Sequence, residues 1–473
     1  MISRQALSLG DPFSGVFDLV GFEFDQNYFF FPVQEVGKEI SSPAGRMRVE
    51  SLGAIGDGNV SRRRGERVRV GRLETMKSIL EVFREFLLLG LTSFGGPTAH
   101  IAFFRDRFVG VKEWLSEKEF ADILALCQFL PGPASSQVGL SIGWHRAGLG
   151  GALAAWFAFT MPSAIALAIF GVAVLSFGAE LEEGAGWLRG LQVAVVVVIA
   201  QAVIAMWKAL CQDRSTRLIA LGAAAVILAT SPAWMQLVVI AAGAVLGLVF
   251  LRSRGDASTG HRPVESSKSS GKALGVACLV AFFALLLGLP LLNSLAPGSA
   301  ILETFSAMYR SGSLVFGGGH VVLPLLSEEV VDPGWVTPEQ FLAGYGAAQA
   351  VPGPLFTFSS YLGTLIDGPI GPWGMAAVAL IGIFLPAWLL VLGVMPFWKG
   401  LVARPGVGAA LAGTNAAVVG LLIAALYTPV WTSAIASADD VVFLIGVAAT
   451  LLILRVPVWA VVIAAGMAGW AFL

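Results

Sequence analysis

The sequence predicts an all-α membrane protein that crosses the bilayer many times and is built from two homologous halves. Of its 473 residues, 56% are hydrophobic and 13% are charged, and this charged share is about half that of a soluble domain. The mean hydropathy is +0.79, and apolar runs of about 20 residues, long enough to span a bilayer as helices, recur along the chain. These runs lack the alternation of polar and apolar residues that a membrane β-barrel requires. Motifs in the second half repeat those of the first.

Residues 1–75 form a polar N-terminal extension that differs in composition from the rest. The segment mixes glycine, serine and charges, and it contains the basic run Arg62-Arg63-Arg64. It lacks the order of charged start, apolar run and small-residue cleavage site that defines a secretory signal peptide. Two interpretations stay open, a disordered cytoplasmic tail or an artefact of gene assignment upstream of a physiological start at Met76. We assign the segment no fold and no function.

Thirteen apolar segments follow, six in each half and one between the halves. They lie near 79–104, 119–143, 150–177, 186–210, 216–231, 233–251, 273–295, 300–326, 339–365, 372–398, 406–428, 438–454 and 456–473. The expected domains are therefore 77–251, a basic linker with one extra helix at 252–299, and 300–473.

Loop charge predicts a cytoplasmic N-terminus, because Lys and Arg concentrate in cytoplasmic loops. With that orientation the inside loops carry Arg146, Lys208, Arg214, Arg217, the basic linker, Lys399, Arg404 and Arg455. The outside loops carry acidic residues, with the exception of 105–118, which holds Arg105, Arg107, Lys112 and Lys118. A re-entrant hairpin in this region would remove the exception.

An internal duplication relates the two halves. Phe94-Gly95-Gly96-Pro97 and His100 correspond to Phe316-Gly317-Gly318-Gly319 and His320, and Gln128 with Pro131-Gly132-Pro133 corresponds to Gln349 with Pro352-Gly353-Pro354, at offsets of 222 and 221. An odd number of crossings before the second copy predicts that it is inverted in the membrane. Inverted repeats with Gly/Pro-broken helices are typical of secondary transporters, whose substrate site lies at the midplane.

Each Pro-Gly-Pro triplet must break its helix, because proline removes a backbone donor and glycine lets the chain swing. In lipid such a break persists only inside protein or beside water. The half-helix that restarts at Ala134 presents free N–H groups and a positive dipole end, which suit an anion, and Ser135, Ser136 and Gln137 add neutral donors. A kinked helix that serves packing alone is the better interpretation of one triplet, but two triplets at equivalent positions favour a binding function.

The glycine motifs have a similar pair of interpretations. Consecutive glycines expose backbone amides for binding, or they serve close helix packing. His100 and His320 each bring a donor within about one turn, although a buried core imidazole is the simpler alternative. We expect no metal there, because no cluster of His, Cys or carboxylates joins them.

Arg310 lies within an apolar segment, where an arginine is costly and defaults to a functional hypothesis. Its planar fork suits a tetrahedral oxyanion. An interfacial arginine or an ion pair with Glu303 is the alternative. The candidate substrate-binding residues are Gly95, Gly96, Pro97, His100, Gln128, Pro131, Gly132, Pro133, Ala134, Ser135, Gln137, Arg310, Gly317, Gly318, Gly319, His320, Gln349, Pro352, Gly353 and Pro354.

The motifs FGGPTAHI (94–101), CQFLPGPASSQ (127–137) and GALAAWFAFTMPSA (151–164) resemble the first domain of the chromate ion transporter family, and FGGGHVVLPLL (316–326), QAVPGPLFTFSSYLG (349–363) and TNAAVVGLL (414–422) resemble its second. The resemblance implies a two-domain, long-chain member in the bacterial inner membrane that exports chromate and confers chromate resistance, with sulfate exchange or a proton gradient involved. It implies no cofactor.

Other functions stay open to different degrees. A passive anion channel or a sulfate-type carrier is the alternative, and a homodimer is an open alternative to a monomer. A membrane-embedded enzyme is disfavoured because HExxH, GxSxG and paired intramembrane carboxylates do not occur. A nucleic-acid partner is disfavoured by the net charge of −1.

Overall fold

The computed structural model describes residues 58–183, 186–230, 235–251, 271–316, 319–402, 404 and 406–472. The chain divides into two compact units, Met1–Lys77 and Ser78–Leu473. In the first unit the described part is the beginning of helix α2 (Gly58–Thr92). Residues 1–57, most of the basic linker, Gly317 and Gly318 lie outside the described residues, so the predictions for them stay predictions.

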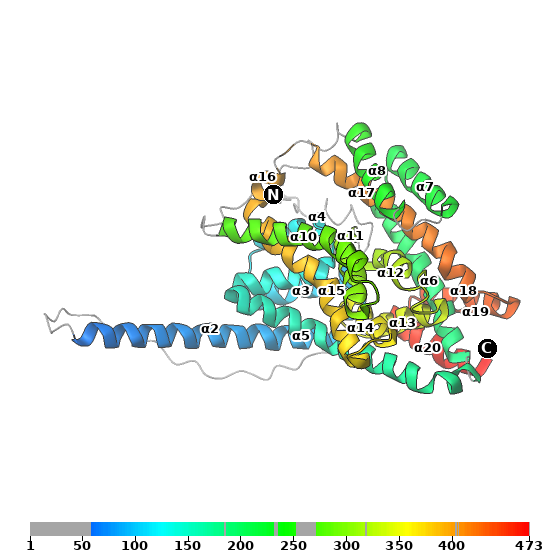
Figure 1. The fold of residues 1–473 in the computed structure, drawn as a ribbon, viewed down its shortest axis with the longest axis horizontal. Coiled ribbons are helices and arrows are strands. Elements are labelled where there is room, and N and C mark those ends of the chain that lie inside the picture. Colours follow the sequence, from blue (N-terminus) through cyan, green and yellow to red (C-terminus); the bar gives the residue numbers. More distant parts are fainter. Residues whose placement is uncertain are drawn as a thin grey trace, which may run out of the picture. The chain divides into compact units, whose positions relative to one another are not determined.

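Helices make up the regular structure of the described residues, as the composition predicts (Figure 1). In the first half these are α2, α3 (Gly96–Arg105), η1 (Asp106–Val111), α4 (Glu117–Phe129), α5 (Ala134–Glu183), α6 (Gly186–Leu210), α7 (Arg214–Ala229) and α8 (Met235–Phe250). Helix α10 (Lys272–Leu295) connects the halves. In the second half they are α11 (Ala300–Leu314), η3 (Gly319–Val321), α12 (Val322–Val330), α13 (Pro338–Ala350), η4 (Leu355–Thr357), α14 (Phe358–Leu365), α15 (Gly371–Val394), η5 (Met395–Phe397), α16 (Trp398–Val402), α17 (Val407–Ala425), η6 (Leu426–Trp431), α18 (Thr432–Ala434), α19 (Ala438–Ala448), η7 (Ala449–Ile453) and α20 (Val458–Phe472).

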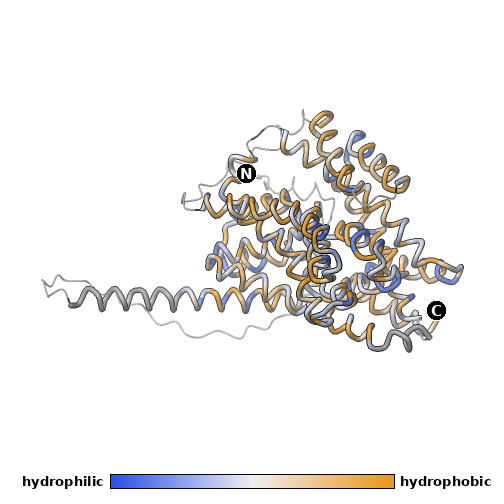
Figure 2. The backbone as a smooth tube through the Cα atoms, viewed as in Figure 1, coloured by the Kyte–Doolittle hydropathy of each residue, from blue (hydrophilic) through white to orange (hydrophobic). Residues whose placement is uncertain are grey.

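Five stretches of the described chain are long and apolar enough to cross a membrane as helices. They are Ala134–Ser176, Gly186–Leu210, Lys272–Leu295, Gly371–Phe397 and Val407–Ala434. Figure 2, which colours the backbone by hydropathy, shows hydrophobic residues along most of the helices, and many large apolar side chains are exposed. On α10, for example, Leu287 and Leu295 are 72% and 73% exposed, which lipid tolerates and water does not. The prediction of an all-α membrane protein is confirmed.

The first apolar segment, 79–104, folds as a hairpin of the C-terminal part of α2 and the short helix α3. Helix α3 has 10 residues, about 15 Å, which is half the thickness of a bilayer core. It runs back along α2, since Phe86 stacks on Phe108 with ring centroids 4.8 Å apart. The Glu85 carboxylate on α2 also pairs with Arg107 and Lys112 beyond the end of α3.

The second segment, 119–143, forms another hairpin from α4 and the first part of α5. A capping box between Ser116 and Glu119 starts α4, and His145 near the end of the returning helix lies 3.7 Å from Glu119. Arg146 pairs with Glu81 of α2 at 2.9 Å, so both hairpins open at the same end of the bundle. We call this end the first mouth and define it by Glu81, Glu85, Arg107, Lys112 and Arg146.

The second half repeats the two hairpins. Helix α11 is joined to α12 by the ion pair between Arg310 and Glu329. A capping box between Thr337 and Gln340 starts α13, and the Tyr361 hydroxyl of α14 donates to the Gln340 carbonyl at 2.8 Å. We call the open end of these hairpins the second mouth and define it by Arg310, Glu328, Glu329 and Asp332.

The contacts between α5 and α14 show that the second half is inverted. After a turn at Gly148, where φ is +61°, α5 runs from the first mouth back past the hairpin tips. A Cβ added at Gly353, at the tip of the second copy, would lie 2.7 Å from the Ser163 Oγ, and one added at Gly171 would touch Thr364 at the far end of α14. Helix α14 therefore leaves the tips in the direction opposite to the returning helix of the first half, and the two mouths lie at opposite ends.

The last helices of each half pack against the other half. Helices α7 and α8 contact α17, and α20 contacts α6 (Figure 1). Backbones touch at both crossings: a Cβ at Gly413 would lie 2.1 Å from the Gly243 carbonyl, and one at Gly190 would lie 2.2 Å from the Ala465 carbonyl. The exchange ties the halves together through small residues, which permit close helix packing.

Candidate functional site

The four helix breaks of the two halves meet. The Gly132 amide in the first Pro-Gly-Pro triplet donates to the Val315 carbonyl at 2.7 Å, and the Gly353 amide in the second donates to the Ser93 carbonyl at 3.0 Å. Val315 corresponds to Ser93 and Gly353 to Gly132, so the two bonds are symmetry equivalents of each other. Two broken elements that lie far apart in sequence thus share one centre.

Glycine is required at both tips for its backbone conformation. The φ angles are +117° at Gly132 and +108° at Gly353, a region that L side chains rarely adopt. Their neighbours differ: a Cβ at Gly132 would lie 2.9 Å from the Gln137 Nε2, which donates to the Pro131 carbonyl, whereas one at Gly353 would meet Ser163. Prolines on both sides end one helix and permit the next to begin.

The breaks place helix ends of both signs in the centre. Each incoming helix ends there with carbonyl groups, and Ser93 and Val315 have theirs satisfied by the tip amides. The outgoing helices begin there with amide groups. Helix α3 has no side-chain cap at its N-cap residue Gly95, and η4, which continues into α14, has none at Pro354. Uncapped N-termini carry partial positive charge, which favours an anion.

His100 connects the two hairpins of the first half. Its side chain is 0% exposed; Nε2 lies 3.2 Å from the Ser93 carbonyl and Nδ1 lies 3.4 Å from the Ser135 hydroxyl. The ring meets Phe159 edge-on, with centroids 5.2 Å apart. Because the Ser93 carbonyl only accepts hydrogen bonds, Nε2 must carry the hydrogen. His100 and Gly353 therefore share one acceptor.

Several buried polar atoms on these elements have no partner in the structure. Buried polar groups are normally hydrogen-bonded, so unpaired ones beside the breaks are candidate ligand groups. Those near the breaks, each at most 5% exposed, are Ser93, Ser136, Gln137 (its Oε1), Thr160 and Ser359. Thr304, Ser306 and Ser311 on α11 also have unpaired hydroxyls. Sequence reasoning missed Thr160, Ser163, Ser359 and Ser93. The signal for the first two was available, since two hydroxyl residues flank Pro162 in an otherwise apolar helix.

The two copies differ in polarity. Applying the sequence offsets of 221, 222 and 224, the first-copy residues Ser93, Ser135, Gln137, Thr160 and Ser163 correspond to Val315, Phe356, Phe358, Phe384 and Ala387. The first half therefore supplies most of the side-chain donors, while the second supplies backbone and apolar surface. The duplication preserved the breaks but few of the polar groups, among them Gln128 with Gln349 and Ser136 with Thr357.

The remaining candidates lie in different surroundings. His320 Nδ1 lies 2.7 Å from the Tyr345 hydroxyl, and the Gln349 Nε2 is buried without a partner. At the offset of 222 His320 corresponds to Thr98, so the predicted correspondence of His100 with His320 is wrong in register. Gln128 is exposed and is not brought to the breaks by any contact described here. Pro97 packs against Gly319.

Arg310 is engaged by a carboxylate. Its guanidinium pairs with Glu329 of the second mouth, while its Nε is buried without a partner. The expected alternative of an ion pair with Glu303 is wrong, because Glu303 accepts a hydrogen bond from the Gly298 amide at the start of α11. A role of Arg310 in anion binding stays a prediction.

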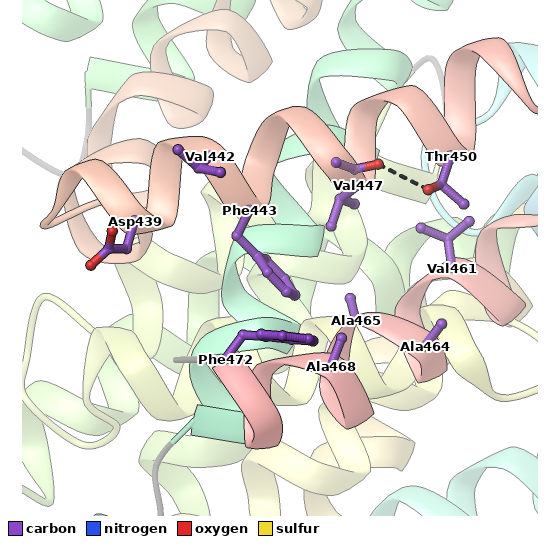
Figure 3. Close-up of a pocket in the computed structure, with 11 residues that line it drawn as sticks. Asp439, Val442, Phe443, Val447, Thr450, Val461, Ala464, Ala465, Ala468 and Phe472 are labelled. Carbon is purple, nitrogen blue, oxygen red and sulfur yellow. Dashed lines mark hydrogen bonds between the residues drawn. The ribbon is translucent and has the colours of Figure 1, made fainter.

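A cavity of about 510 Å³ lies elsewhere, between α19, η7 and α20 (Figure 3). Figure 3 shows Phe443 and Phe472 facing each other across it, with Asp439 at one end. The Thr450 hydroxyl is already bonded to the Gly446 carbonyl. An apolar groove whose charged residue is acidic does not suit an anion, so the candidate site is the centre where the breaks meet.

The comparisons with known proteins agree with this architecture. The family described as "Chromate transporter" matches residues 80–248 and 302–470, two stretches that are again offset by 222. A "Chromate transport protein" of Pseudomonas aeruginosa is 31% identical over 399 residues, covering 82% of this chain and 91% of that protein. One of Cupriavidus metallidurans (strain ATCC 43123 / DSM 2839 / NBRC 102507 / CH34) is 28% identical over 351 residues, covering 72% and 80%. No solved structure matches. The chain therefore belongs to the chromate transporter family of membrane proteins, with one copy of the family's domain in each half.

Proposed function

We propose that this protein is a secondary transporter that carries a tetrahedral oxyanion, chromate, out of the cell by alternating access. The observation that carries the proposal is the reciprocal pair of hydrogen bonds, Gly132 to Val315 and Gly353 to Ser93, at the meeting point of four helix breaks. Three relatives whose names include chromate transport support the choice of substrate.

The anion binds among neutral donors at this centre. Uncapped helix N-termini and the hydroxyls of Ser93, Ser136 and Thr160 replace its hydration shell, since these hydroxyls have no other partner. Each hydroxyl has one hydrogen to give, so several together surround the oxygens of a tetrahedral ion. The site requires no metal and no catalytic group.

Alternating access follows from the inverted design. Opening at the first mouth separates the hairpins of the first half from the second-half tip at Gly353. Opening at the second mouth separates the hairpins of the second half from the first-half tip at Gly132. Each opening breaks one of two equivalent backbone hydrogen bonds, and each costs about the same, on the order of 1 kcal/mol net. Two states of similar energy are what a carrier needs.

The charges at the two mouths support an orientation with the N-terminus in the cytoplasm of a bacterial inner membrane. The first mouth has three basic and two acidic residues, and the second has one basic and three acidic residues. Because both first-half hairpins open at the first mouth, the basic loop 105–118 lies at the same end as Arg146. Its expected exception to the positive-inside rule disappears.

Transport of chromate into sulfate-loaded proteoliposomes tests the proposal. The proposal expects saturable chromate uptake that internal sulfate accelerates, since both are tetrahedral dianions. Uptake that rises linearly with chromate and ignores internal sulfate would make the protein a passive channel, and no uptake would remove the oxyanion assignment. Gly222→Ala is the matched control for substitutions, since a Cβ there has no heavy atom within 4 Å.

Physiological direction is tested in cells. Expression in a chromate-sensitive bacterium should lower accumulated chromate and raise the tolerated concentration. Raised accumulation would show uptake and overturn the efflux assignment.

A further inference from the structure

We propose that His100 takes up a proton together with the oxyanion, so that anion and proton occupy the centre as a pair. The inference rests on the proposed function, because it assigns a second ion to the same site. The bound proton is held at Nδ1 of the His100 imidazole.

The hydrogen bonds of His100 determine where that proton binds. Nε2 donates to the Ser93 carbonyl at 3.2 Å, so the neutral ring has its lone pair on Nδ1. That nitrogen faces the Ser135 hydroxyl at 3.4 Å, which donates to it in the neutral state. A proton that binds Nδ1 turns the hydroxyl round, so that Ser135 accepts from the ring and its own hydrogen becomes free to point at an anion.

Charged groups on the elements that pack against His100 lie away from it, toward the first mouth. The Ser93 break, the segment 351–354, α14 and residues 148–179 of α5, which include Phe159, carry no charged residue. On α2, α3, η1 and the first part of α5, the charged or titratable residues nearest in sequence are Glu81, Arg84, Glu85, Arg105, Asp106, Arg107, His145 and Arg146. Most of these pair with one another or with Glu117, Glu119 and Lys112, and Arg84 and Asp106 are exposed.

The proton and the anion bind cooperatively, because the elements described above place no charged residue beside His100 to pair with either of them. A fully buried imidazolium without a partner is costly, and so is a dianion among neutral donors. Together they leave one net negative charge instead of two, and the attraction between them offsets part of the desolvation of each. Binding of one therefore strengthens binding of the other by the same factor.

Proton uptake on anion binding is the decisive measurement. Titration calorimetry of the purified protein with sulfate, in buffers of different ionisation enthalpy, gives the number of protons bound per anion. Sulfate is the probe because it stays doubly ionised across the neutral range, so any proton taken up belongs to the protein. Chromate above about pH 8, where it too is a dianion, provides a second probe.

The expected result is uptake of up to one proton per anion, with affinity that falls as pH rises, by as much as about tenfold per pH unit. His100→Gln, whose amide can still donate to the Ser93 carbonyl, should bind without proton uptake and with a flat pH profile. His145→Gln, at the first mouth, should match the wild type. Proton-free binding by the wild type, or proton uptake that survives His100→Gln, would overturn the inference and leave the transporter assignment intact. Failure of the wild type to bind either anion would instead overturn the proposed function.

A spectroscopic readout covers the case in which His100→Gln fails to fold. The chain has four histidines, so ¹⁵N-histidine NMR of the wild type resolves few signals, and His145→Gln, His261→Gln and His320→Gln assign them by elimination. Sulfate should move the His100 Nδ1 signal to the imidazolium position, and an unchanged signal would contradict the inference.

Discussion

Replacing Gly353 by alanine tests the geometry on which the centre depends. Its φ of +108° is strained for any residue with a Cβ, and a Cβ there would lie 2.7 Å from the Ser163 Oγ and 3.2 Å from the Ser163 Cβ. A short serine on a packed helix has little freedom to withdraw. The substitution therefore meets both a conformational and a steric cost.

The expected loss is about 2–6 kcal/mol of unfolding free energy, the sum of about 1–3 for backbone strain and about 1–3 for overpacking. Gly132→Ala has the same strain, with φ of +117°, but its Cβ meets the end of the Gln137 side chain and makes an ordinary contact with Ala387. Gln137 can withdraw only by giving up its 2.7 Å hydrogen bond to the Pro131 carbonyl. We expect about 2–4 kcal/mol there, the strain plus about 1 kcal/mol for that bond. The helical Gly222→Ala, with open space around its Cβ, should be neutral or stabilising by up to about 1 kcal/mol.

Apparent unfolding temperatures in detergent and exchange rates in proteoliposomes check this ranking. Gly353→Ala should lose transport at an expression level where Gly222→Ala keeps it. Adding Ser163→Ala removes the hydroxyl clash and should restore part of the lost stability, though not the part due to φ. Wild-type stability and transport in Gly353→Ala would refute the tip geometry.

Three further predictions concern the exchanged helices and the second mouth. Gly413→Ala should destabilise by about 1–3 kcal/mol because its Cβ would lie 2.1 Å from the Gly243 carbonyl; an unchanged unfolding temperature would contradict the packing. Arg310→Gln should abolish transport while leaving the protein in the membrane. If the arginine serves only its ion pair, the double variant Arg310→Gln with Glu329→Gln should restore transport. Continued inactivity of the double variant assigns Arg310 to the anion. Burial, together with the nearby carboxylates of Glu329 and Asp332, raises the pKa of Glu328 to about 8. Between about pH 5 and pH 8 the folded state therefore binds a proton that the unfolded state has lost, and the free energy of unfolding should fall as pH rises through this range. Glu328→Gln should reduce the dependence of the unfolding temperature on pH. An unchanged pH dependence would show that Glu328 is not its cause.

The sequence was sufficient to predict the helical class, the duplication and the breaks. Apolar run length and repeated Pro-Gly-Pro triplets are local signals, and the structure agrees with them at Pro131-Gly132-Pro133 and Pro352-Gly353-Pro354. Run length alone could not distinguish a membrane-spanning helix from a hairpin. Segments such as 79–104 are long enough to span, and only the basic loop 105–118 signalled that the chain returns.

Contacts between the halves could not be predicted, because they depend on tertiary geometry that no local pattern encodes. Motif comparison paired His100 with His320 since both follow a glycine run, yet only His100 bonds to a break carbonyl. Arg310 looked unpaired or bound to Glu303 from its position on one helix. Its partner Glu329 lies on the returning helix of a hairpin that the segment count had treated as part of one span.

Thr160 connects the unpaired polar atoms to function. If its hydroxyl binds the anion, replacing it should raise the stability of the protein without anion and lower the affinity for sulfate. The group is 0% exposed and has no partner, so Thr160→Val, which keeps the shape, removes an unsatisfied buried hydroxyl and should stabilise the empty protein by about 1 kcal/mol. If the hydroxyl binds the anion, the same variant should bind sulfate about tenfold more weakly, the loss of one hydrogen bond of about 1.4 kcal/mol. Thr364→Val is the control, since its hydroxyl already donates to the Tyr361 carbonyl and its loss should weaken stability without changing affinity. A Thr160→Val protein that gains stability and keeps full affinity would place the anion elsewhere in the centre.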